Sequence, residues 1–154
     1  MAGFTTAFPT SMKAELPQAI HNFTITTGHV FKCALGLATP TGTYGAATTN
    51  YSVLTGNSDE IANGNGYTTG GFAWTAAQNI TPLTSGTGAY WQWSVNPSWT
   101  SATISTSGCI IYNSSASGQA VYVGSFGGTQ TVTAGTLTLV QPTNGGGTSL
   151  LQLN

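Results

Sequence analysis

Charged side chains are almost absent from this sequence. Five residues carry a formal charge, 3% of the 154 in the chain, and arginine does not occur. An ordinary soluble domain is about 25% charged, and that charge keeps separate molecules soluble and apart. A chain without it is expected to hold much of its surface against other copies of itself or other proteins. The composition therefore indicates a structural component. The five charged residues are Lys13, Glu15, Lys32, Asp59 and Glu60.

The same shortage excludes several kinds of partner. The net charge is −1 with no basic cluster, so nothing marks a nucleic-acid surface. No run approaches the ~18 apolar residues of a membrane helix, and we expect no membrane contact. The first residues also lack the basic start and apolar core of a signal peptide. Synthesis in a cytoplasm is therefore expected.

Catalytic constellations are missing as well. Asp59 and Glu60 are adjacent, so their side chains diverge in an extended loop, whereas a glycosidase holds two carboxylates about 5–10 Å apart across a sugar bond. Serines are abundant, but no base and orienting partner is placed to activate one. We therefore expect no enzymatic activity and assign no catalytic residue.

Two segments contain side chains of the kinds that bind metals. Residues 57–66 are rich in oxygen atoms, but Ca²⁺ takes roughly six to eight oxygen ligands, several of them carboxylates. Turn-forming Asn and Asp explain this segment more simply, with one of the two carboxylates capping backbone donors in the loop itself. His21 and His29 have only Cys33 nearby, whereas zinc needs three or four ligands. We expect no metal and no other cofactor.

The remaining composition predicts an all-β fold. Aromatic residues make up 10% of the chain, and 21 glycines supply turns between strands. From residue 30 the pattern has period two, with Phe31, Cys33, Leu35 and Leu37 on one face and Lys32 on the other. We predict an antiparallel two-sheet β-sandwich or jelly roll as a single domain over residues 30–154. The further strands are expected near 51–54, 72–76, 91–95, 101–106, 109–113, 119–126, 130–140 and 148–153.

Residues 1–29 are predicted to form an N-terminal arm. Met12 to Ile20 can make a short helix with Ser11 as its N-cap, limited by Pro17. The arm is apolar and uncharged at its tip, and we expect it to bind a neighbouring subunit. The candidate interface residues are Phe4, Phe8, Met12 and Leu16.

Cysteine and tryptophan each allow two interpretations. Cys33 and Cys109 lie in apolar strand-like runs, so we expect buried free thiols, with a disulfide between neighbouring strands as the alternative. Trp91 and Trp93 share one face of a strand, which suits either a sugar-stacking platform or packing between sheets. We favour core or interface packing for the tryptophans, which include Trp74 and Trp99.

Several phrases in order resemble a family of small virion structural proteins of tailed bacteriophages. They are Ser11 to Leu16 with His21-Asn22-Phe23, the stretch Asp59 to Gly71, Pro97-Ser98-Trp99, Gly108 to Asn113, and Ala120 to Gly127. Together they span most of residues 11–140. The chain is poorer in charge than this family and has a longer Thr/Gly stretch over residues 39–49.

The resemblance implies a β-rich particle component without an assigned functional site. We expect a capsid decoration or cement protein that stabilises the shell, located in the virion and assembled in the bacterial host cytoplasm. Its partners would be the major capsid protein or other virion proteins, and the chain itself would form a homo-oligomer. A tail-associated or fibre component is the alternative, and a carbohydrate-binding module using surface tryptophans is another.

Overall fold

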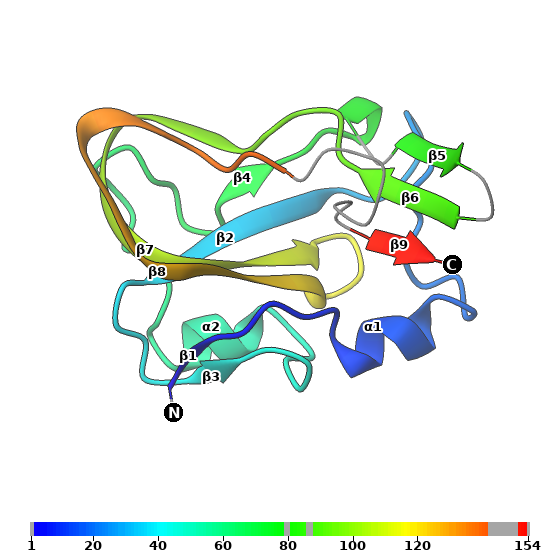
Figure 1. Ribbon diagram of the computed structural model, residues 1–154, viewed down its shortest axis with the longest axis horizontal. Helices are drawn as coiled ribbons and strands as arrows, with labels where there is room; N and C mark the ends of the chain where they lie inside the picture. Colours follow the sequence, from blue (N-terminus) through cyan, green and yellow to red (C-terminus); the bar gives the residue numbers. More distant parts are fainter. Residues whose placement is uncertain (1, 79–80, 86–87, 142–150, 154) are drawn as a thin grey trace.

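The computed structural model describes residues 2–78, 81–85, 88–141 and 151–153, and in this part of the chain the fold is β-rich (Figure 1). None of the described helices is long and apolar enough to cross a membrane. The strands are β1 (Gly3–Phe4), β2 (Phe31–Leu37), β3 (Thr43–Tyr44), β4 (Phe72–Ala73), β5 (Thr81–Ser85), β6 (Gly88–Gln92), β7 (Ser98–Asn113), β8 (Gln119–Thr138) and β9 (Leu151–Leu153). The helices are α1 (Thr10–Glu15), α2 (Ser52–Gly56) and the 3-10 turn η1 (Ala76–Gln78).

The main sheet is antiparallel and has the strand order β4-β2-β7-β8. On β2 the side chains of Phe31, Cys33 and Leu35 are buried in one apolar cluster, as the period-two pattern predicts. Ala34, on the opposite side, is buried in a second cluster. Both faces of this strand are therefore covered. A smaller sheet has the order β5-β6-β9.

The hairpin of β7 and β8 bends where one strand has extra residues. Thr106 pairs with Gln130 and Gly108 with Ser125, so a single residue of β7 faces the whole stretch 126–129 of β8. Such an insertion bends a strand pair and increases its twist. In Figure 1 both strands of the hairpin bend at the left of the view. We call residues 98–105 of β7 and 131–138 of β8 the outer half of the hairpin, and this half lies over β2. Trp99, Ala102 and Ile104 from this outer half join the cluster that contains Cys33 and Leu35.

The other face of the main sheet is covered by β1, β3 and α2, all from the first sixty residues. Tyr44 of β3 and Leu54 of α2, both 0% exposed, pack there with Ala34, Ile110 and Val123. β1 pairs with β3 in parallel, and Ala7 forms an isolated bridge with Val123. The chain thus covers both faces of its main sheet with its own segments.

Two predictions of local secondary structure are wrong, one for a helix N-cap and one for a strand. α1 begins at Thr10, whose N–H is bonded to Ala46 O, so Ser11 lies inside the first turn rather than at the N-cap. The Ser11 hydroxyl is buried without a hydrogen-bond partner among the described residues. The strand expected near 51–54 is the helix α2, because Asn50 Oδ1 accepts the Ser52 N–H at 2.8 Å and starts a turn.

Other strand predictions are confirmed with different bounds. The segments 101–106 and 109–113 are one continuous strand, β7, and the segments 119–126 and 130–140 are joined in β8, which ends at Thr138. In each case a bulge continues the strand where the glycine pattern suggested a break. The expected strand at 148–153 is described only as β9, since its first three residues lie outside the described part.

Candidate functional site

Asp59 lies at the centre of a buried hydrogen-bond network. Its side chain is 0% exposed. The backbone N–H groups of Thr41 and Gly42 donate to its two oxygens, each at 2.8 Å, and the Tyr44 hydroxyl donates at 2.6 Å. Burial opposes ionisation, but the bonds from Tyr44, Thr41 and Gly42 outweigh it and hold the pKa of Asp59 below its ordinary value. A carboxylate therefore caps backbone donors, but these donors are at residues 41 and 42 and not in the 57–66 segment where they were expected.

Glu60 closes the next loop in the same way. Its carboxylate accepts hydrogen bonds from the Gly70 N–H at 2.6 Å, from the Tyr67 hydroxyl at 2.8 Å and from the Tyr51 hydroxyl. The Tyr67 oxygen also accepts the buried Leu35 N–H of β2 at 3.1 Å. Glu60 therefore connects the 60–71 loop to the main sheet through a tyrosine.

Burial of the surrounding tyrosine hydroxyls, together with the nearby carboxylates, disfavours ionisation of these phenols. Burial and the bond to Asp59 raise the pKa of Tyr44 to about 12. Burial and the nearby Glu60 raise the pKa values of Tyr51, Tyr67 and Tyr112 further above the ordinary value. Each phenol thus stays a hydrogen-bond donor across the physiological range.

The third carboxylate is engaged as well. Glu15, at the end of α1, accepts from His21 Nε2 at 2.7 Å and from Gln119 Nε2 at 3.3 Å. Of the five charged residues, all of which are described, only Lys13 is exposed. The described residues contain no group of three His, Cys, Asp or Glu side chains that could hold a metal ion.

The candidate interface residues of the arm contact the chain's own domain. Phe4 stacks on Tyr44 with ring centroids 4.7 Å apart, and Phe8 lies against Tyr122 at 5.2 Å. Met12 is 1% exposed within the main cluster, and Leu16 packs at its edge. The contact of this set with another subunit stays a prediction, and Met12 has almost no surface left for it.

The tryptophans are mainly core residues. Trp74 and Trp93 stack with ring centroids 4.6 Å apart and are 0% and 2% exposed. Trp99 is 5% exposed. Trp91 is half-buried and lines a shallow groove with Phe23. The paired platform of Trp91 and Trp93 is therefore not present, because one of the two rings is buried.

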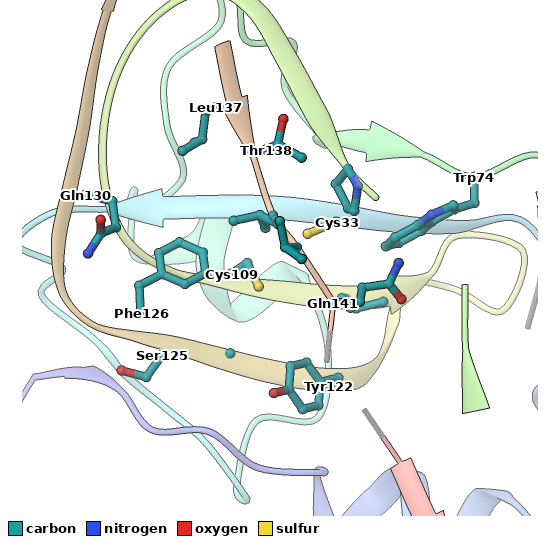
Figure 2. A pocket seen from close by; sticks show the side chains of 15 residues that line it. Cys33, Trp74, Cys109, Tyr122, Ser125, Phe126, Gln130, Leu137, Thr138 and Gln141 are labelled. Carbon is teal, nitrogen blue, oxygen red and sulfur yellow. The ribbon is translucent and has the colours of Figure 1, made fainter. Parts of the chain in front are cut away.

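Both cysteines are buried free thiols, as predicted. Interaction with the Cys109 side chain, together with burial, raises the pKa of Cys33. Such a thiol is a poor nucleophile. Figure 2 shows both sulfur atoms beside an apolar groove. The groove has a volume of about 550 Å³ and lies between the inner half of the hairpin (residues 109–113 of β7 and 119–125 of β8) and residues 137–141 at the end of β8 and just after it. Phe126 and Leu137 line it, and no charged side chain does.

No protein-family model, curated protein or solved structure matches this chain. The site therefore has to be interpreted from its own chemistry.

An acceptor role was expected for one of the two carboxylates Asp59 and Glu60, but not for both, and their tyrosine partners were not expected. Tyr44 is 15 residues before Asp59, and Tyr51 is nine residues before Glu60. The separation gives no periodic signal, because loops rather than regular elements bring these residues together. Only the tertiary packing reveals the networks.

Proposed function

We propose that the protein is a non-enzymatic structural component of a tailed-phage virion, most simply a capsid decoration or cement protein. The observation that carries this proposal is the use of all three carboxylates inside the fold. Their oxygens bind backbone N–H, phenol, amide and imidazole groups, which leaves a surface dominated by Thr, Ser, Gly and Asn. The resemblance to phage virion proteins over residues 11–140 supports the same function.

A neutral surface favours association through backbone and hydroxyl hydrogen bonds and through apolar contact. Such contacts respond weakly to ionic strength, whereas exposed ion pairs are screened within ~10 Å at 0.1 M salt. We also propose that the main sheet and the outer half of the β7–β8 hairpin serve as the two layers of a sandwich. The large apolar cluster between them supports that arrangement.

The test is the number of copies in purified particles, measured by quantitative mass spectrometry before and after washing at about 1 M salt. Hundreds of copies that survive the wash would support shell decoration. A dozen or fewer would favour the tail or fibre alternative. Absence of the protein from the particle would refute the virion proposal. Complete release by salt would refute the proposal that uncharged contacts hold the protein on the particle.

The carbohydrate-binding alternative is weakened by the burial of Trp74, Trp93 and Trp99. Only the half-buried Trp91 is placed to stack on a sugar. A single ring gives a small platform, so we do not base the proposal on it.

A further inference from the structure

Asn113 is a fully buried amide that joins two histidines. Its exposed fraction is 0%. Its Nδ2 lies 2.9 Å from His29 Nδ1 and 3.1 Å from His21 Nδ1. Asn113 ends β7, whereas both histidines belong to the N-terminal arm, so this junction connects segments more than 80 residues apart in sequence.

The orientation of the amide is fixed by its other atom. Asn113 Oδ1 accepts the backbone N–H groups of Ser115 at 3.1 Å and Ala116 at 3.2 Å. The oxygen therefore faces the hairpin turn, and the nitrogen has to face the imidazoles. Because an amide nitrogen only donates, both Nδ1 atoms act as acceptors.

We propose that this junction is an acid-sensitive latch that holds residues 16–30 of the arm on the β7–β8 turn. A protonated imidazole carries N–H on both nitrogens. Its Nδ1–H would then meet the Asn113 N–H₂ group, two donors facing each other. Acid in the range where histidine takes up protons, between about pH 5 and 8, would loosen the junction.

The neighbouring groups differ between the two histidines. Glu15 accepts from His21 Nε2 at 2.7 Å, so a carboxylate faces the other nitrogen of that ring. At His29 a second donor, the Asn22 N–H at 3.5 Å, faces Nδ1 beside Asn113. Glu15 is the one carboxylate bonded to this junction among the described residues.

Opening the latch would loosen contacts on both sides of it. Val30 exchanges backbone and side-chain hydrogen bonds with Ser114 and Ser115 of the turn. Phe23 stacks on Phe31 of β2 with ring centroids 4.7 Å apart. Release of residues 16–30 would therefore uncover one end of the core. This inference does not depend on the proposed function.

The test is thermal unfolding of the full chain between about pH 8 and pH 5. Because a charged imidazole would lose its bond from the Asn113 amide, we expect stability to rise with pH over this range. We expect the wild-type Tm at the acid end to be lower by roughly 2–6 °C. Asn113→Asp keeps an acceptor for the turn and presents an oxygen to the imidazoles, so the sign of the pH dependence should reverse.

Two further variants separate the latch from general effects. Asn50→Asp is the matched control, because Asn50 Nδ2 also bonds the turn, at Ser117 O, and it should keep the wild-type pH slope. His29→Asn places an oxygen near the Nδ1 position without titrating, and it should flatten the slope. This variant also tests the latch if Asn113→Asp does not fold. A flat wild-type profile, or the same slope in wild type and His29→Asn, would overturn the proposal.

Discussion

Replacing Asp59 with Asn tests whether the buried carboxylate organises the loops around it. The amide keeps one acceptor oxygen but turns a nitrogen donor toward Gly42 N–H or Thr41 N–H. Bonds to an ionised acceptor contribute about 1.5–3 kcal/mol, and a buried donor left without a partner costs about 1–3 kcal/mol. The Tyr44 hydroxyl can rotate to accept instead, which recovers part of the loss. We expect Asp59→Asn to lower the free energy of unfolding by about 2–4 kcal/mol.

The pH dependence gives a second, independent measure. Because the pKa of Asp59 is lowered in the folded state, its stabilising effect is fully present above the unfolded carboxyl pKa, about 3.9. That effect is lost as the pH falls through the lower folded value. The difference between wild type and Asp59→Asn should therefore be largest near neutral pH and shrink as the pH falls below the unfolded carboxyl pKa, about 3.9.

The assay is urea unfolding followed by tryptophan fluorescence at neutral and at acid pH. Lys13→Gln is the control, since it removes an exposed charge and should change stability by no more than about 0.5 kcal/mol. An Asp59→Asn variant as stable as this control would refute the network's role. A stability gap of the same size at both pH values would refute the assignment of the effect to ionised Asp59.

Two more predictions follow from the backbone and the phenols. A Cβ on Gly71, at φ +78°, would lie 1.9 Å from Cys33 O, so Gly71→Ala should lower the free energy of unfolding by about 3 kcal/mol or more, measured in urea. Gly56→Ala in α2 meets nothing within 4 Å and should be neutral or slightly stabilising; equal effects would contradict the close approach. Since the pKa values of Tyr44 and Tyr67 are raised, their contribution to stability should be constant up to about pH 10 and fall as the pH rises through the folded values. Phenol ionisation, followed by ultraviolet absorbance, should accompany unfolding, and full titration of the folded protein near pH 10 would disprove this.

The strands that sequence predicts well are those with an internal pattern. The alternation over Phe31 to Leu35 correctly assigns three side chains to one face, because burial on that face repeats every second residue. The free thiols Cys33 and Cys109 follow from the same apolar runs. Local pattern is sufficient where one face of one strand determines the structure.

Segments determined by distant contacts were not predictable in this way. Residues 51–54 have strand-forming side chains, but the Asn50 bond to Ser52 N–H and the complete burial of Leu54 favour a helical turn. The intrachain packing of the arm is another example: Phe4 packs over Gly36 and Gly108, where a Cβ would lie within 2.3 Å of its ring. Two glycines in separate strands create that recess, and their proximity is a tertiary property.

The scarcity of charge has a different meaning once the carboxylates are located. Asp59 and Glu60 are neighbours whose side chains diverge, so one satisfies donors near β3 and the other satisfies donors of the 60–71 loop. An ionised carboxylate accepts several hydrogen bonds at once, which Asn and Gln cannot match. Charge is therefore retained where irregular backbone needs a strong acceptor. The outer surface is nearly neutral because the acidic groups are used for folding. The fold therefore uses the carboxylates, whereas the assembly that we propose uses the uncharged surface.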